Sequence, residues 1–325
     1  MRTLALLLLL YFFKPPCAGA QLAVAPSSKA YTAVGANKSP AFNDSVALNN
    51  KRVYVVAGLH ATAYAATLTV LSTAWYSGYA KTPFHTFNDS REWLQMDKVG
   101  HAWTAYNIAT YSTRLWQWPG MAPRNAGVLG GLSALGYQTI LEFLDAHSAA
   151  WGWSWADMGA NTFGATLFTA QELAWGSQKV RLKFSSFPTH YEPSLQPRAD
   201  ALFGKTFPER LLKDYNAQTY WASVNLHSFS NTFPAWLNLA IGYGANGMYG
   251  GFKNIAVDKN GAVVFDRNDI ARERQWFLSL DVDWTKIKTN KKGVRMLFSL
   301  MNMIKVPAPA LELRSGKLKA HWLSF

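Results

Sequence analysis

The sequence has 325 residues, enough for two ordinary domains, and its 14 Trp are typical of a membrane interface or of a large aromatic core. The only cysteine is Cys17, so a chain cleaved after Ala20 has no disulfide, thiolate metal site or cysteine nucleophile. Charge is uneven: residues 21–175 contain nine Lys and Arg against eight Asp and Glu, whereas residues 176–325 contain 21 against 11. This basic C-terminal half is suited to anionic lipid or envelope polymers, or its charge simply keeps the region soluble.

Residues 1–20 are predicted to be a signal peptide. Arg2 precedes an unbroken apolar run at residues 4–13, which is too short to span a bilayer, and small residues at positions 18–20 fit a cleavage site. Lipidation at Cys17 is the alternative, although Lys14, Pro15 and Pro16 depart from the usual lipid-attachment pattern. The protein is therefore expected to be exported.

Residues 21–50, rich in Ala, Ser, Asn and Pro, are predicted to be a flexible tether. Residues 51–176 are predicted to form an antiparallel bundle of about four membrane-type helices. The expected helical segments span residues 53–79, 96–118, 125–146 and 155–175. Ser154 is the expected N-cap of the last segment.

Residues 177–325 are predicted to form a basic α+β region, so the fold class is mainly α with a mixed C-terminal part. Apolar and polar residues alternate at 180–185 and 276–284, which indicates strands. Hairpins are expected around residues 258–261 and at Ser315-Gly316. Residues 214–229 and 234–243 fit helix or strand, and helix is favoured.

The ionisable residues of the helical half have regular spacing. Each of three helix ends contributes part of one polar cluster: Asp97, Lys98 and His101; Glu142 and Asp145; Asp157 and Asn161. In an up-and-down bundle the start of the second helix, the end of the third and the start of the fourth share one end. These side chains are therefore predicted to meet in one layer.

Three interpretations of the cluster remain open. Lys98 and His101 could neutralise the carboxylates and fix the helix register. A divalent metal such as Zn²⁺ or Mn²⁺ could bind among Asp97, His101, Glu142, Asp145 and Asp157. In acid–base catalysis, His101 would be the base and a carboxylate, Asp97, Glu142 or Asp157, would orient it.

Two segments carry a resemblance to known families. Met96 to Trp103, with its Asp-Lys-x-x-His pattern, resembles the helix start of the YfiM-like family of uncharacterised periplasmic lipoproteins. Residues 142–145 and 154–161 resemble the second motif of that family, and the combination is also similar to VanZ-like membrane proteins, which are linked to glycopeptide resistance. The resemblance covers roughly residues 50–175 and implies an envelope location without an assigned activity.

We expect a non-enzymatic envelope protein in the periplasm or at the outer membrane, associated with membrane through its helices. No cofactor is predicted, and a divalent metal stays open. The expected partners are membrane lipid and anionic envelope polymers or other envelope proteins, not nucleic acid. The alternatives are a metal- or acid/base-dependent enzyme acting on a lipid-linked envelope substrate, and a β-rich outer-membrane component suggested by Phe325 but disfavoured by Lys317, Lys319 and His321.

Overall fold

A computed structural model describes residues 47–73 and 79–324 of the protein. The predicted signal peptide, Cys17 and most of the predicted tether lie outside the described residues. The helices are α2 (Asn50–Leu71), η2 (Glu92–Gln95), α3 (Met96–Gln117), α4 (Pro123–Asp145), α5 (Trp155–Trp175), α6 (Gln196–Phe203), α7 (Phe207–Lys213), η3 (Leu226–Ser228), η4 (Trp284–Lys286) and α8 (Lys292–Met301). The strands are β1 (Val180–Ser186), β2 (Gln218–Asn225), β3 (Leu237–Asn246), β4 (Ile255–Val257), β5 (Val263–Asp266), β6 (Glu273–Val282), β7 (Ala308–Arg314) and β8 (Lys317–Ser324).

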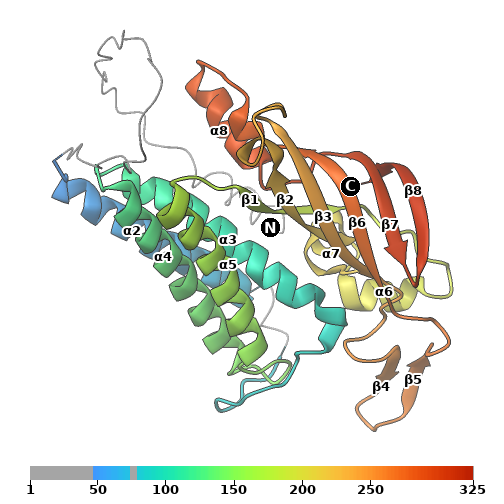
Figure 1. The fold of residues 1–325 in the computed structure, drawn as a ribbon. Coiled ribbons are helices and arrows are strands. Elements are labelled where there is room, and N and C mark those ends of the chain that lie inside the picture. Colours follow the sequence, from blue (N-terminus) through green and yellow to red (C-terminus); the bar gives the residue numbers. More distant parts are fainter. Residues whose placement is uncertain (1–46, 74–78, 325) are drawn as a thin grey trace.

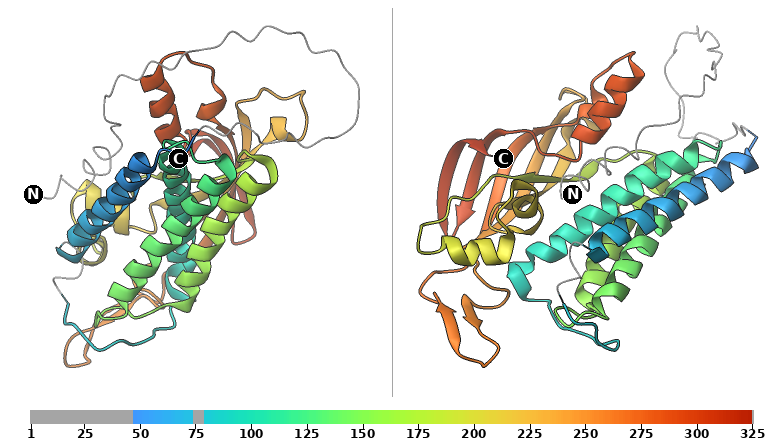
Figure 2. Two further views of the ribbon diagram at one scale, coloured as in Figure 1. Left: turned by 90° about the vertical axis from the view of Figure 1, so that its left-hand side faces the viewer. Right: turned by 180° about the vertical axis from the view of Figure 1, so that it is seen from behind.

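Helices α3, α4 and α5 pack closely against one another, and α2 lies along them with fewer contacts (Figures 1 and 2). Small residues allow the backbones to approach: a Cβ on Gly164 would lie 2.1 Å from the Ala102 carbonyl oxygen. Tyr106 and Phe168 fill the centre between these helices. Ser154 caps α5 as predicted, because its hydroxyl accepts a hydrogen bond from the Asp157 amide at 3.0 Å.

The prediction of about four membrane-type helices is wrong. Within residues 47–73 and 79–324, only α2 is long and apolar enough to cross a membrane by length and composition. Helix α3 carries Asp97, Lys98 and Arg114, and its remaining face mixes Ala and Thr with aromatic residues. That composition suits helices that pack on protein rather than on lipid.

The description of the chain as mainly α is also wrong, because the C-terminal half is built around a six-stranded antiparallel sheet in the order β1-β2-β3-β6-β7-β8. Strands β2 and β3 occupy segments in which helix was favoured. Their register, with Tyr220 opposite Tyr243, is fixed by pairing with distant β1 and β6. Such non-local pairing overrides the helix preference of Ala and Leu. The predicted hairpins at β4–β5 and β7–β8 are confirmed.

The sheet is curled, and its two faces differ in an unusual way. Residues 303–305 hydrogen-bond to Phe184 of β1 and then continue into β7, so one end of the sheet turns back on itself. The concave face buries polar groups: Lys183 and Asp281 form a fully buried ion pair at 2.7 Å. The convex face is apolar. Helix α3 covers it over β1 and β2, where Trp103 contacts Phe184 and Tyr220, and Met96 at the start of α3 shares an apolar cluster with Ala245 of β3.

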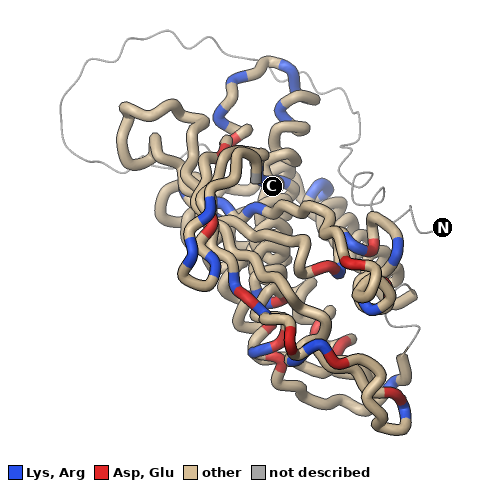
Figure 3. Tube along the Cα trace, turned by 90° about the vertical axis from the view of Figure 1, so that its right-hand side faces the viewer, with Lys and Arg blue, Asp and Glu red and all other residues tan. Residues whose placement is uncertain are grey.

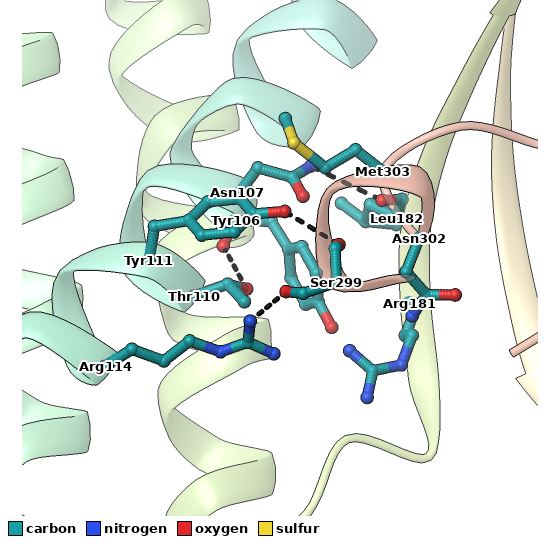
Figure 4. A pocket seen from close by; sticks show the side chains of 10 residues that line it. All are labelled: Tyr106, Asn107, Thr110, Tyr111, Arg114, Arg181, Leu182, Ser299, Asn302 and Met303. Atoms are coloured by element: carbon teal, nitrogen blue, oxygen red, sulfur yellow. Dashed lines mark hydrogen bonds between the residues drawn. The ribbon is translucent and has the colours of Figure 1, made fainter. Parts of the chain in front are cut away.

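Helix α8 is fixed to the helical part at one point. Tyr111 of α3 donates a hydrogen bond to the Ser299 carbonyl at 2.9 Å, and Arg114 bonds to the Ser299 hydroxyl (Figure 4). Trp284 of η4 packs on Phe298 on the inner side of α8, with ring centroids 5.5 Å apart. The outer face of α8 is exposed.

Candidate functional site

A left-handed turn lies immediately before the charged cluster, which we define as the ionisable and amide side chains around Lys98 and His101 of α3. Trp93, Leu94 and Gln95 have positive φ angles of 47°, 51° and 66° immediately before α3 begins. This conformation costs roughly 1–2 kcal/mol per non-glycine residue, and contacts from elsewhere hold it. The Trp93 amide bonds to the Gly251 carbonyl at 2.8 Å, and Arg274 of β6 donates to Gln95 Oε1 at 2.6 Å. The sheet region thereby fixes the direction in which α3 starts.

Lys98 is the centre of an ion network. Its Nζ lies 2.5 Å from Asp89 Oδ2, 2.9 Å from Asp97 Oδ2 and 2.7 Å from Asp157 Oδ1. Asp89 also accepts a hydrogen bond from the Ser154 hydroxyl at 2.5 Å. Because the Lys98 side chain is only 10% exposed, these three carboxylates replace most of its hydration. Lys98 thus connects the loop before α3, α3 itself and the start of α5.

His101 lies one turn further along α3, between α4 and α5. Its Nδ1 is 3.1 Å from Asn161 Oδ1 and 3.6 Å from Glu142 Oε1. Its Nε2 is 3.8 Å from Asp97 Oδ1 and also 3.8 Å from Asp157 Oδ1. One side of the ring therefore faces acceptors from α4 and α5, and the other faces two carboxylates.

Burial and charge shift the pKa values of the cluster in a consistent way. Burial raises the pKa of Glu142 to about 8 and that of Asp157 to about 7. Burial alone would lower the pKa of His101, but Asp97, Asp157 and Glu142 raise it to about 9. Burial would likewise raise the pKa of Asp97, yet His101 and Lys98 outweigh it, and the pKa is lowered. The cluster contains more carboxylates than cations to neutralise them.

The predicted convergence is present: Asp97, Lys98, His101, Glu142, Asp157 and Asn161 lie together at one end of α3, α4 and α5. Asp145 is close enough to Glu142 to contribute to the raised pKa of that residue.

Sequence reasoning missed three members of the cluster. Asp89 precedes α3 in an irregular loop. Gln138 is one turn before Glu142 on α4, and its Nε2 donates to Asn161 Oδ1 at 2.6 Å. Tyr215 comes from the sheet region and donates its hydroxyl to Asp97 Oδ1 at 2.8 Å. The i, i+4 spacing of Gln138 and Glu142 is a signal that could have found Gln138. The fold alone brings Asp89 and Tyr215 to the site.

A cavity of about 240 Å³ lies at the other end of α3. It is lined by Thr110, Thr113, Arg114, Gln117, Phe168, Glu172, Gly176, Ser177, Gln178 and Arg181. From His101 to Thr113 the helix rises about 18 Å. A molecule in this cavity would therefore not contact the charged cluster.

Comparison with known proteins finds one similarity, which lies in the helical part. Residues 86–171 match the model of a family described as predicted periplasmic lipoproteins, a domain of unknown function (DUF2279). No curated protein and no solved structure matches the chain significantly. The protein is exported, periplasmic and membrane-associated, as expected from its sequence. The match supports the envelope lipoprotein part of the expected resemblance but not its YfiM-like or VanZ-like assignment.

The matched range contains α3, α4, α5 and the loop before them, and so every cluster residue except Tyr215. Strands β1 to β8 lie outside it. The comparisons therefore describe the helical part of the chain and leave the basic sheet region to be interpreted from its structure.

Proposed function

We propose that this protein is a non-enzymatic envelope protein that binds an anionic membrane surface through its C-terminal sheet and helix α8. The observation that supports the proposal is the reversed polarity of the curled sheet. In a water-soluble sheet with one enclosed face, the enclosed face is apolar and the open face is polar. Here most enclosed side chains are polar, around one small apolar cluster of Trp221, Ala240 and Phe277, and the open face is apolar.

The enclosed face contains a continuous polar network. Asp281 of β6 pairs with Lys183 and accepts a hydrogen bond from the Ser223 hydroxyl at 2.6 Å. Asn238 donates to Ser223 at 2.8 Å, and Asn225 donates to Asn238 at 2.8 Å. These groups satisfy one another, so the network needs no solvent and no ligand.

The open face bears large apolar side chains on four neighbouring strands. Register places Ile241 opposite Leu278, Leu278 opposite Leu311, and Leu313 opposite Leu318. We call this surface the uncovered sheet face; it comprises Ile241, Trp276, Leu278, Leu280, Leu311, Leu313, Leu318 and Trp322. Each of these residues is at least 42% exposed. Contiguous apolar patches of this kind are rare on soluble monomers and mark contact with lipid or protein.

Charge favours lipid as the occupant. The segment after β6 carries five exposed cations, Lys286, Lys288, Lys291, Lys292 and Arg295, and residues 284–311 contain no Asp or Glu. Figure 3 shows Lys and Arg gathered along this loop and helix. Met296 and Leu297 are exposed beside the cations. Exposed basic residues with apolar neighbours on one short helix are typical of binding at the lipid interface.

The cationic segment lies at one end of the uncovered sheet face. Leu280 is two residues before the end of β6, where η4 and then α8 follow. Trp236 is at the same end, because its carbonyl accepts a hydrogen bond from the Asp283 amide at 2.8 Å. In this arrangement the cations contact headgroups while the sheet face contacts hydrocarbon.

A single-cysteine probe tests this proposal. The full chain with Cys17→Ser and Leu280→Cys is labelled with a polarity-sensitive fluorophore and mixed with vesicles of phosphatidylglycerol and phosphatidylethanolamine. The expected result is a blue shift, because the probe leaves water. The matched controls are Leu132→Cys on α4 and Val264→Cys on β5, both exposed apolar positions, where no shift is expected.

Charge dependence is checked with the same probe. Replacing Lys291, Lys292 and Arg295 by Gln should weaken binding to anionic vesicles by roughly a hundredfold, because each of the three cations near the surface contributes about 1 kcal/mol. A shift at Leu132 but not at Leu280 would contradict the proposal. A blue shift at Leu280 on addition of a soluble polyanion, with no shift on addition of vesicles, would also contradict it and would indicate binding to an envelope polymer.

The enzyme alternative is not advanced, because the cavity and the charged cluster lie at opposite ends of α3. The β-rich outer-membrane alternative shares with the proposal an apolar sheet face that contacts lipid. Lys317 and Lys319 are on the opposite face from Leu318, because side chains alternate along β8 and Lys319 lies opposite Glu312 of the enclosed face. The objection from Lys317, Lys319 and His321 therefore does not apply to the uncovered sheet face.

A further inference from the structure

The two carboxylates that face His101 Nε2 are too far away for hydrogen bonds. The Nε2 atom is 3.8 Å from Asp97 Oδ1 and 3.8 Å from Asp157 Oδ1, whereas such hydrogen bonds are about 2.7–3.2 Å long. All three atoms lie within 4.8 Å of one another. Ligands at about 2.0–2.2 Å from one Zn²⁺ in tetrahedral geometry lie roughly 3.3–3.6 Å apart. A small contraction would therefore allow the three atoms to share one ion.

The surroundings of Nδ1, on the other side of the His101 ring, resemble those of a histidine that binds a metal through Nε2. Asn161 Oδ1 lies 3.1 Å from Nδ1, where it can accept a hydrogen bond from that nitrogen, while Nε2 faces the two carboxylates. Glu142 is 1% exposed, and its Oε1 has no hydrogen-bond partner and lies 3.6 Å from Nδ1. Tyr215 orients Asp97 through its hydroxyl. These are the roles that outer residues play around a histidine-bound metal.

The charge balance also favours a cation. Four carboxylates belong to the cluster: Asp89, Asp97, Glu142 and Asp157. Lys98 is the one lysine in the cluster, which leaves an excess of three carboxylates. A divalent ion would compensate two of these. Lys98 Nζ lies 2.7 Å from Asp157 Oδ1, so the lysine and the ion would both contact that oxygen. Asp89 and Asp97 hold the lysine in place.

We propose that Asp97, His101 and Asp157 bind one divalent transition-metal ion, Zn²⁺ or Mn²⁺, which links α3 to α5. An imidazole with two carboxylates is a donor set that suits these ions better than Mg²⁺ or Ca²⁺. The ion enters where the Asp97 and His101 side chains are 25% and 16% exposed. Its role is to hold the helices together, and this site is independent of the proposed membrane surface.

Calorimetric titration tests the site. The full chain, prepared without a histidine tag and treated with chelator, is titrated with Zn²⁺ and with Mn²⁺ alone, and bound metal is counted by elemental analysis. We expect one ion per chain and at least tenfold weaker binding for His101→Gln and for Asp157→Asn. His147→Ala is the matched control, because that ring bonds to the Phe143 carbonyl outside the cluster, and its affinity should be unchanged.

Two further measurements test the site if His101→Gln or Asp157→Asn fails to fold. Asp97→Asn changes the most exposed ligand and should also weaken binding, with near-UV circular dichroism as the folding check. Co²⁺ added to the unaltered chain should give the intense visible bands of a four-coordinate site. Absence of stoichiometric binding by the unaltered chain, or full binding by folded His101→Gln and Asp157→Asn, would overturn the proposal.

Discussion

The helical part and the sheet part of this protein use buried charge in different ways. In the helical part, Lys98 is surrounded by three carboxylates at one end of three helices. In the sheet part, Lys305 is 1% exposed, donates to the Val306 carbonyl at 2.6 Å and lies 4.8 Å above the Trp221 ring. The first lysine joins elements, whereas the second fills an enclosed polar face. Buried charge alone therefore does not mark a functional site; convergence from several elements does.

The same contrast holds for the surface. The helical half, residues 21–175, has a net charge of +1, and the C-terminal half, residues 176–325, has +10. The charges of the cluster in the helical half are largely buried and face one another. The cations of the segment 286–295 are exposed and lie next to apolar residues. This difference assigns internal cohesion to the helices and surface binding to the sheet.

Lys98→Met should have the largest effect on stability. It leaves Asp89, Asp97 and Asp157 buried without their shared cation, and breaking a buried ion pair costs about 3–5 kcal/mol. Urea denaturation of the metal-free chain measures the free energy of unfolding. Lys259→Met, at an exposed hairpin position, is the control and should change it by less than about 0.5 kcal/mol. A similar small effect for both would show that the network does not hold the helices.

Gly164→Ala should cost about 2–3 kcal/mol, because the new methyl group would lie 2.1 Å from the Ala102 carbonyl oxygen and force α3 and α5 apart. Gly159→Ala is on the same helix with nothing within 4 Å of the added carbon. That control should be neutral or stabilise by up to about 1 kcal/mol. Thermal unfolding of the two variants side by side distinguishes close packing from helix propensity.

The charged cluster could be predicted from the sequence to a considerable extent. Charged residues at i, i+4 or i, i+3 spacing occur at three helix ends, and the short loops fix which ends meet. Asp89 and Tyr215 could not be predicted in this way, because the left-handed turn brings Asp89 to Lys98 and the fold of the sheet region brings Tyr215 to Asp97. The sequence identified most residues of the charged cluster, but it did not show that the cluster also contacts the C-terminal half of the chain through Tyr215.

Two strands of the sheet, β2 and β3, were missed, for a physical reason. Its concave face is polar and its convex face apolar, so Ser223 and Asn238 are buried where apolar residues are expected. Residues 214–229 and 234–243 therefore did not show the usual pattern of a strand facing a core. Gly242 adds to this, because the Trp221 ring would lie 2.7 Å from a Cβ at that position and covers the glycine on the concave face.

Lys305→Met should stabilise the protein, in contrast to Lys98→Met. Burial lowers the pKa of Lys305 from its ordinary value of 10.5 to about 8. The unfolded chain therefore binds this proton more tightly, so the charged group costs stability below pH 8 and the cost disappears as the pH rises from about 8 to 10.5. At pH 7 the variant should gain about 1–2 kcal/mol, after allowance for its lost hydrogen bond. The free energy of unfolding of the variant should also lack the increase between about pH 8 and 10.5 that Lys305 gives the unaltered chain. A variant that is less stable than the unaltered chain at pH 7 would contradict this prediction.

Hydroxyl-radical footprinting of the unaltered full chain, with and without phosphatidylglycerol vesicles, tests the central claim most directly. Oxidation is followed at Leu278, Leu280, Leu313 and Trp322 of the uncovered sheet face and at Leu132 and Phe163 of the helices, all of them exposed. The account predicts that vesicles protect the four sheet positions and leave the two helical positions as reactive as before. Protection of Leu132 and Phe163 with unchanged reactivity at Leu280 and Trp322 would contradict it.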